Sequence, residues 1–145
     1  MQYYAVIDTN VIVSSMLKKD SIPGQIIQFI SENIITPILN KDILDEYVEV
    51  LSRNKFGFKS KEIENLLAAI RANAIYLERK QTIEDFVDGD DIVFFEIVMS
   101  ARSLLDAYLV TGNMKHYPIR SYIVTPREMI DIIEKENGPI QIDSK

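Results

Sequence analysis

The sequence predicts an α/β domain in which a central, mainly parallel sheet is covered by helices on both faces. Three observations lead to this fold class. Short apolar runs of strand length alternate with longer amphipathic segments along the whole chain, the usual pattern of parallel strands joined by helices. The chain has 145 residues, enough for one domain that buries roughly 70% of its unfolded surface. It contains no cysteine, so the core must form without disulfides.

The first half of the chain contains two predicted strands and four predicted helices. Residues 3–7 and 34–39 are apolar runs that fit buried strands, although Pro37 interrupts the second. Asn10 is expected to cap a short helix that ends near Leu17. The other helices show apolar residues at helical spacing: one begins near Pro23 and carries Ile26, Ile27, Phe29 and Ile30; one is capped by Asn40 and carries Ile43, Leu44, Tyr47, Val48 and Leu51; one is capped by Ser60, extends over 60–77 and carries Ile63, Leu66, Leu67, Ile70 and Ala74.

The second half continues the alternation after an acid-rich loop. The predicted elements are a loop over 84–91, a buried helix over 92–104, strands over 107–110 and 122–124, and a last helix that opens with the capping box Thr125-Pro126-Arg127-Glu128. Gly138-Pro139 ends that helix. We therefore expect one domain over residues 1–137 and a C-terminal tail over 138–145.

Composition excludes several classes of function. The net charge is −6, which argues against a protein that coats nucleic acid by charge alone. A single histidine, His116, and no cysteine exclude cysteine zinc sites and thiol catalysis and disfavour a serine–histidine triad. The glycines lie too far apart for a phosphate-binding loop. Apolar segments fall short of the ~18 residues of a membrane span, and no secretory signal is present, so a cytoplasmic location is expected.

Topology brings three acidic residues to one edge of the predicted sheet. Asp8 ends the first strand, and helices that follow strands begin at the same carboxyl edge. Glu46 and Asp91 lie near the starts of two such helices, and Asn113 follows the strand over 107–110. The strand order is open at this stage, so these side chains could still be spread along the edge.

Three neighbouring carboxylates need an explanation. Two unit charges about 4 Å apart repel by ~4 kcal/mol at an effective dielectric near 20. The carboxylates therefore hold a cation, or are partly protonated, or stand apart. Oxygen ligands without histidine or cysteine favour Mg²⁺ or Mn²⁺, and such an ion suits hydrolysis of a phosphodiester.

Four motifs at these positions resemble those of the PIN domain family. They are Val-Ile-Asp8-Thr9-Asn10-Val-Ile-Val, Ile-Leu-Asp-Glu46-Tyr, Asp90-Asp91-x-x-Phe and Tyr-Leu-Val-Thr111-Gly112-Asn113. The later Ile-Val-Thr-Pro-Arg-Glu stretch is similar to the end of the branch described as toxins of toxin–antitoxin pairs, the VapC-like ribonucleases. The resemblance covers residues 1–134. It implies a three-layer fold, an RNA substrate, a Mg²⁺ or Mn²⁺ cofactor, an antitoxin protein as partner, and a homodimer as in many members.

The resemblance also implies roles for individual residues. Asp8, Glu46 and Asp91 would be the catalytic, metal-binding acids, with Asp91 preferred over Asp90 because it directly precedes the x-x-Phe spacing. Thr111 would orient an acid or a water, and Asn10 would brace Asp8. Asn113 stands where many members have a fourth acid. An amide supplies an oxygen without charge, so this departure could weaken metal binding, favour one ion over two, or mark a branch.

Each of these residues also has a purely structural interpretation. Aspartate and asparagine after strands often cap turns, an aspartate at a helix start is favoured by the helix dipole, and Glu46 could be a solvated flank. Glu96 is expected on a modest polar helix face with Ser100 and Ser103, and a buried Glu96 that faces the cleft is the less favoured alternative. His116 as a general base is not required.

The segment over 53–61 mixes basic and aromatic residues. Its Arg53, Lys55 and Lys59 could contact RNA phosphates. Lys115, His116 and Tyr117, which follow Asn113, could also reach a substrate phosphate. Alternatively, the segment is a loop between helices and its two phenylalanines turn toward the core. We favour this interpretation for the two phenylalanines.

Two functions remain in competition. The first is a metal-dependent endoribonuclease of the toxin type. The alternative is a catalytically weak or inactive PIN-like module that binds RNA or protein, suggested by Asn113 and by the net negative charge. A phosphatase is disfavoured, because Asn10 stands where its second aspartate belongs.

Overall fold

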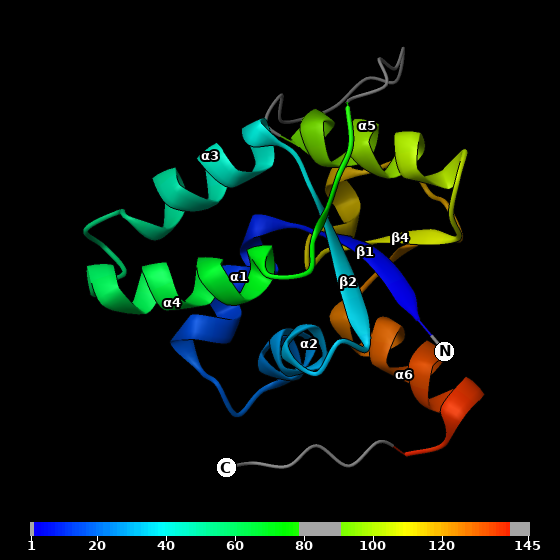
Figure 1. Cartoon of the computed structure of the whole chain (residues 1–145), viewed down its shortest axis with the longest axis horizontal. Helices are drawn as coiled ribbons and strands as arrows, with labels where there is room; N and C mark the ends of the chain where they lie inside the picture. Colours follow the sequence, from blue (N-terminus) through cyan, green and yellow to red (C-terminus); the bar gives the residue numbers. More distant parts are fainter. Residues whose placement is uncertain (1, 79–90, 140–145) are drawn as a thin grey trace.

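The computed structural model, which describes residues 2–78 and 91–139, contains a five-stranded sheet between two layers of helices (Figure 1). The strands are β1 (Tyr3–Ile7), β2 (Ile35–Leu39), β3 (Ile75–Tyr76), β4 (Ala107–Val110) and β5 (Ile123–Val124). Their order is β3-β2-β1-β4-β5, and every paired neighbour is parallel. The predicted three-layer α/β fold with a parallel sheet is confirmed.

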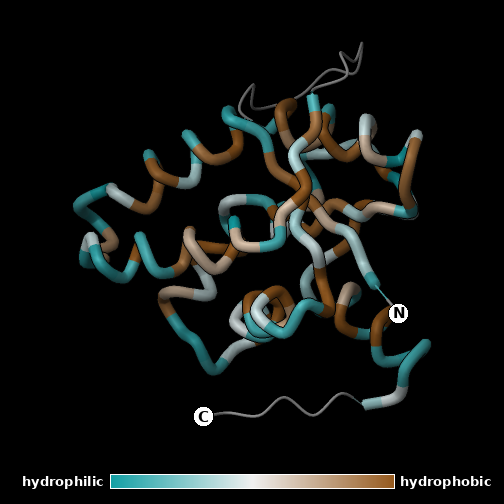
Figure 2. The backbone as a smooth tube through the Cα atoms, viewed as in Figure 1, coloured by the Kyte–Doolittle hydropathy of each residue, from teal (hydrophilic) through white to brown (hydrophobic). Residues whose placement is uncertain are grey.

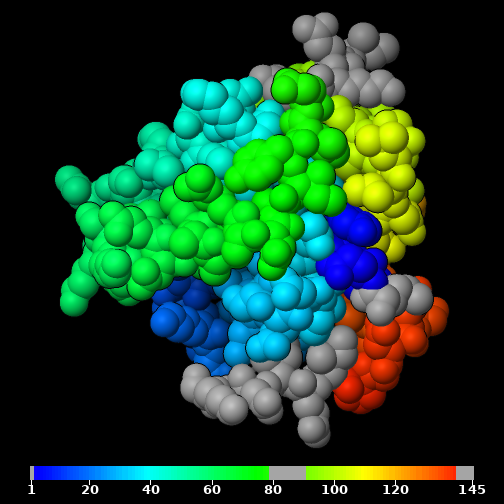
Figure 3. All heavy atoms as spheres, in the orientation of Figure 1, coloured from blue at the N-terminus to red at the C-terminus, as the bar shows by residue number. Residues whose placement is uncertain are grey.

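Helices cover both faces of this sheet. α1 (Thr9–Leu17), α2 (Ile22–Ser31) and α6 (Pro126–Asn137) pack together on one face. α5 (Asp91–Arg102) covers the other face and contacts α3 (Lys41–Leu51), and α4 (Ser60–Arg71) packs against α2. α3 and α4 stand out from the rest of the molecule on one side (Figure 3).

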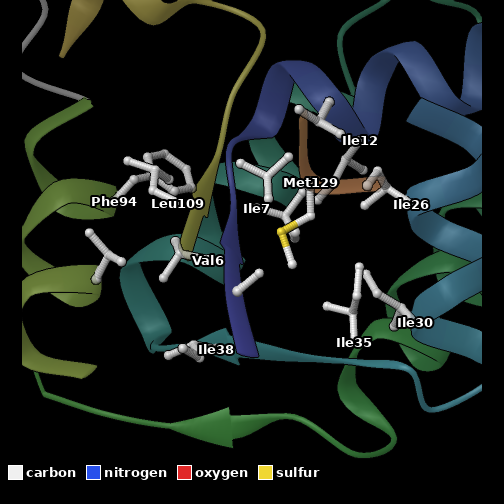
Figure 4. Close-up of a cluster of buried hydrophobic side chains, with 14 of the residues drawn as sticks. Val6, Ile7, Ile12, Ile26, Ile30, Ile35, Ile38, Phe94, Leu109 and Met129 are labelled. Carbon is white, nitrogen blue, oxygen red and sulfur yellow. The ribbon is translucent and has the colours of Figure 1, made fainter. Parts of the chain in front are cut away.

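The central strand β1 is buried on both of its faces. Figure 4 shows Val6 on the side of Phe94 in α5, whereas Ile7 lies on the opposite side with Ile12 of α1 and Ile26 of α2. All five side chains are at most 1% exposed. Along the whole chain, hydrophobic residues gather in the strands and in α5, while α3 and α4 alternate between polar and apolar residues (Figure 2). A doubly covered parallel strand explains why the run over 3–7 is apolar without alternation.

The long elements match their predicted positions to within about two residues, and the exceptions have local causes. The helix predicted over 60–77 ends at Arg71, and the next residues form the unpredicted strand β3, which pairs with Ile38 and Leu39 of β2. Two residues are too short to show a strand period, and Tyr76 is 52% exposed. Because β3 reaches only the end of β2, Pro37 meets no second partner strand there.

Two of the four predicted helix caps are confirmed. The Asn40 side chain accepts a hydrogen bond from the Ile43 backbone N–H at 2.8 Å. Thr125 and Glu128 form the predicted capping box, with bonds of 3.1 Å and 2.8 Å, and α6 then continues to Asn137.

The other two caps are wrong, because both helices begin before the predicted cap. Asp8 and Lys59 hold the cap positions, so Asn10 and Ser60 lie inside α1 and α4. The Glu62 carboxylate accepts the Lys59 backbone N–H instead. Ala74 lies outside α4.

Two side chains differ from their predicted environment. Val48, expected on the buried stripe of α3, is 47% exposed. Glu96, expected on a polar face of α5, is 3% exposed, because its neighbours Phe95 and Ile97 are also buried and the covered face of α5 is wide. In the predicted acidic loop over 84–91, Asp91 is the residue that falls within the described part of the chain; Asp90 lies outside it.

Across residues 2–78 and 91–139, none of the helices is both long enough and apolar enough to span a bilayer.

The Tyr47 hydroxyl connects α3 to the central strand by a hydrogen bond, and removal of this hydroxyl tests the contact. The fully buried hydroxyl donates to the Ile7 carbonyl at 2.5 Å. Tyr47→Phe keeps the ring but loses this bond, so we expect a loss of about 1 kcal/mol, or roughly 3–5 °C in Tm for a domain of this size. Thermal unfolding measures the change. Tyr76→Phe, at a half-exposed site, is the matched control, and an equal loss in both variants would contradict the packing described here.

Candidate functional site

A pocket of about 450 Å³ lies at the carboxyl edge of the sheet. It is lined by Asp8, Thr9, Asn10, Val13, Ser14, Glu46, Val50, Arg53, Lys55, Phe56, Asp91, Asn113 and His116. The three predicted acids therefore face one pocket from three elements, the end of β1, the middle of α3 and the start of α5. The topology explains this, because β1 lies between β2 and β4, the chain leaves β1 and β2 at this edge, and α5 begins at the same edge before it runs back to the start of β4.

The remaining predicted residues divide into two groups. Asn10, Asn113, Arg53 and Lys55 line the pocket, whereas Thr111 lies behind it and contacts Asp8. Lys59 and Lys115 are exposed and do not line the pocket.

Asp8 is a buried carboxylate, 4% exposed, that is held by two hydroxyl groups. Its Oδ2 atom accepts a hydrogen bond from Thr111 Oγ1 at 2.7 Å and another from the Tyr117 hydroxyl at 2.9 Å. Burial raises the pKa of Asp8, and these two hydroxyls act in the opposite direction without cancelling that rise. Both hydroxyls bond Oδ2, so neither of them occupies Asp8 Oδ1.

The negative charge of the pocket also acts on the tyrosines beside it. Burial raises the pKa of Tyr117, and the nearby carboxylates of Asp8 and Asp91 raise it further. Burial likewise raises the pKa of Tyr47, with Asp8 and Glu46 adding to the effect. Both hydroxyls therefore stay protonated at neutral pH and act as hydrogen-bond donors.

Glu46 and Asp91 each have a partner from another element. Thr9 Oγ1 donates to Glu46 Oε2 at 2.5 Å, which ties α3 to the residue directly after Asp8. His116 Nδ1 lies 2.9 Å from Asp91 Oδ2. The carboxylates are thus positioned by neighbouring side chains.

The loop over 111–117 supplies most of these contacts. Its Gly112 backbone N–H donates to Asn10 Oδ1 at 3.0 Å, so the Asn10 side chain holds the loop, while the Asn10 backbone is hydrogen-bonded to the Asp8 carboxylate and lowers its pKa. A Cβ atom at position 112 would stand 3.1 Å from that oxygen, tighter than ordinary van der Waals contact, which favours glycine here. The Asn113 backbone N–H donates to Thr111 Oγ1 at 3.0 Å.

The donor set suits a hard cation, although no metal cluster is preformed. Three carboxylates and the Asn113 amide bring oxygen atoms to the same pocket, the ligand type that Mg²⁺ and Mn²⁺ prefer. Within the described ranges, no three acidic, histidine or cysteine side chains lie close enough together to hold a metal ion. The described carboxylates therefore line one pocket without forming a three-ligand cluster, and burial raises the pKa of Asp8.

Basic and aromatic side chains form one rim of the pocket. Arg53 pairs with Glu49 at 2.8 Å on the surface of α3. Lys55 Nζ lies 5.1 Å from the centre of the Phe56 ring, and Phe56 stacks on Phe58 with ring centres 5.5 Å apart. Both rings are half-buried against the core, which confirms the inward orientation favoured from the sequence, yet Phe56 also reaches the pocket.

Sequence reasoning did not foresee the contacts that Thr9, His116 and Tyr117 make with the acids. Thr9 stands in the first of the four motifs, but no role was predicted for it. His116 and Tyr117 were considered as residues that could reach a substrate phosphate, whereas the structure shows them bonded to Asp91 and Asp8. Tyr117 lies 109 residues from Asp8 along the chain, so no local pattern indicates this pair.

Comparisons with known proteins agree with this geometry. A family model described as the PIN domain matches residues 4–115, a range that includes the three acids and Asn113. An uncharacterized protein of Methanocaldococcus jannaschii is 25% identical over 142 residues, which covers 90% of this chain and 91% of that protein.

The raised pKa of Asp8 predicts that Asp8→Asn stabilises the fold when no metal is present. The folded state binds the Asp8 proton more tightly than the unfolded state, so the charged form opposes folding at neutral pH. An asparagine oxygen can accept the same two hydroxyl bonds without charge. We therefore expect Asp8→Asn to have a higher Tm than wild type at pH 7 in the presence of a chelator, because the variant lacks the charge that opposes folding.

The sign of the pH dependence checks the cause of this effect. As the pH falls from neutral through the raised pKa of Asp8, the wild-type carboxylate becomes protonated. Wild type is then no longer less stable than Asp8→Asn. The difference in Tm should therefore narrow in acid. Asp131→Asn, at an exposed site on α6, should show no such pattern, and an Asp8→Asn variant that is less stable than wild type at pH 7 would contradict the assignment.

Proposed function

Since the chain belongs to the PIN domain family, whose members are generally nucleases, we propose that it is a Mg²⁺- or Mn²⁺-dependent endoribonuclease. The observation that carries the proposal is the pocket lined together by Asp8, Glu46 and Asp91. Its reaction would be hydrolysis of RNA phosphodiester bonds.

The three carboxylates would hold the ion in this proposal. When bound, a divalent ion of this kind makes water a stronger nucleophile and neutralises charge that develops on the phosphate. Thr111 and Tyr117 hold Asp8 by its Oδ2 atom, and Thr9 holds Glu46. These donors satisfy oxygen atoms that would otherwise be buried without partners, and they limit rotation of the carboxylates before substrate arrives.

Asn113 and the basic rim would act on the substrate. Asn113 is exposed at the mouth of the pocket, where its amide can donate to a phosphate oxygen or accept from a ribose hydroxyl. Arg53 and Lys55 line the same pocket as the acids, and their positive charge would attract the phosphate backbone. This local charge offsets the net acidity of the chain.

The toxin role extends the same proposal. A chain that cleaves RNA in the cytoplasm would arrest growth, and a small antitoxin protein would silence it by covering the pocket. This role, the antitoxin and the homodimer rest on the resemblance of the stretch near 123–128 to that branch of the family.

A binding module without catalysis is the competing proposal. The separation of the three acids and the uncharged Asn113 favour it, because both weaken the attraction of the pocket for a cation. The two proposals differ in whether the purified chain cleaves RNA when divalent ions are added.

Neutralising the acids should abolish cleavage. Each of Asp8→Asn, Glu46→Gln and Asp91→Asn removes one negative charge from the pocket with little change in shape, so we expect the cleavage rate to fall roughly 100-fold or more. The measurement is cleavage of a labelled RNA in Mn²⁺ and in Mg²⁺, with chelator as the blank.

Glu64→Gln provides the matched control for these variants, since Glu64 is an exposed acid on α4. It should cleave at the wild-type rate. Full activity in Asp8→Asn, with its fold intact, would rule out the proposed enzyme, and absence of cleavage by wild type would favour the binding module.

Removing the basic rim should change substrate binding more than chemistry. In the double variant Arg53→Ala/Lys55→Ala we expect KM to rise roughly tenfold with kcat nearly unchanged, and the slope of log(kcat/KM) against log salt to flatten by about 1 to 2. Loss of the exposed Arg53–Glu49 pair alone should matter little. Arg71→Ala/Lys135→Ala removes the same charge at two exposed sites that do not line the pocket. Equal changes in both double variants would show that only the net charge of the protein affects KM.

A further inference from the structure

We propose that His116 and Tyr117 act together as a clamp that positions the acids of the pocket. In this clamp the His116 imidazole orients Asp91, and the Tyr117 hydroxyl orients Asp8. The inference rests on the proposed nuclease function and adds two positioning residues to it. Neither residue falls within the range matched by the family model, which ends at residue 115.

A short 3-10 helix, η1 (Met114–His116), aims the two side chains in different directions. The His116 backbone N–H donates to the Asn113 carbonyl at 3.0 Å, and the Tyr117 N–H donates to the Met114 carbonyl at 3.2 Å. Adjacent residues at this turn thereby reach carboxylates on different elements, Asp8 after β1 and Asp91 at the start of α5. One rigid turn fixes two acids that are 83 residues apart in sequence.

The contact between His116 and Asp91 also defines the state of the imidazole. His116 Nδ1 lies 2.9 Å from Asp91 Oδ2, and a carboxylate only accepts hydrogen bonds. Nδ1 therefore carries the hydrogen, and in the neutral ring Nε2 carries none. This hydrogen bond fixes the orientation of the Asp91 carboxylate as well as that of the imidazole ring. Residues that hydrogen-bond to metal ligands commonly orient those ligands in the same way.

Tyr117 is placed to do the same for Asp8. The side chain is 6% exposed, and its hydroxyl donates to Asp8 Oδ2 at 2.9 Å. Thr111 bonds the same oxygen from another direction at 2.7 Å. Because Tyr117 and Thr111 both bond Oδ2, the Oδ1 atom of Asp8 is oriented away from these two donors.

Nuclear magnetic resonance can test the imidazole state without metal, substrate or activity. His116 is the one histidine of the 145-residue chain, so its ring ¹⁵N signals need no assignment. At pH 9 we expect the Nδ1–H form in wild type and loss of that preference in Asp91→Ala, measured by long-range ¹⁵N–¹H correlation. An Nε2–H form in wild type would overturn the clamp.

Two replacements of His116 separate positioning from substrate contact. The amide nitrogen of asparagine falls near the place of Nδ1, whereas that of glutamine falls near Nε2. The clamp predicts that His116→Asn cleaves RNA within about threefold of wild type, while His116→Gln loses roughly 10–100-fold in kcat at unchanged KM. The reverse order, or a rise in KM alone, would mean that Nε2 touches the substrate and would overturn the inference.

Tyr117→Phe tests the second half of the clamp. It keeps the buried ring and removes the donor to Asp8, so kcat should again fall roughly 10–100-fold with KM unchanged. Tyr122→Phe is the matched control, because its hydroxyl donates to Met99 Sδ and Tyr122 does not line the pocket; it should cleave like wild type. Equal cleavage rates for Tyr117→Phe and wild type would show that the Tyr117 hydroxyl does not position Asp8.

The two proposals fail in different ways. If wild type cleaves no RNA, the nuclease proposal fails, and the ring ¹⁵N spectrum still decides whether His116 holds Asp91. If wild type cleaves RNA but His116→Asn is no better than His116→Gln, the nuclease stands and the clamp is overturned.

Discussion

A buried carboxylate at the end of the central strand is the constraint around which the site is organised. Asp8 is 4% exposed, and a charged group at such a position destabilises the fold unless donors compensate for the lost water. Thr111 and Tyr117 supply those donors from the loop over 111–117. Because that loop must stay against Asp8, it also brings Asn113 and His116 to the pocket, and the Gly112–Asn10 contact fastens it to α1.

The same principle extends from Asp8 to the other two acids. Each carboxylate bonds to a side chain from a different element, Glu46 to Thr9 and Asp91 to His116. These bonds keep three like charges around one pocket without bringing them within the distance of a metal cluster. Burial is the main cause of the raised pKa values of Tyr47 and Tyr117, and the neighbouring carboxylates raise both further. A cation would relieve this repulsion, and Arg53 and Lys55 would then meet a phosphate chain at the rim.

The parts that could be predicted are those determined by local pattern or by topology. Long apolar runs located β1 and α5, and Asn40 and Thr125 were recognisable caps because their partners lie three residues away. The acids were found because parallel strands end at one edge. β3 has no period to detect, and the Asn10 side chain, predicted to cap α1, instead accepts a bond from Gly112, which is remote in sequence. The contact between Tyr117 and Asp8 could not be predicted for the same reason, since the two residues are 109 positions apart.

Titration of Mn²⁺ into wild type and Asp8→Asn, followed by calorimetry and by Tm, tests the central claim most directly. That claim is that the three acids form one cation site. It predicts saturable binding in wild type with a rise in Tm, since a ligand that binds only the folded state stabilises it, and neither effect in Asp8→Asn. Equal rises in both proteins, or no binding by wild type at millimolar Mn²⁺, would contradict it.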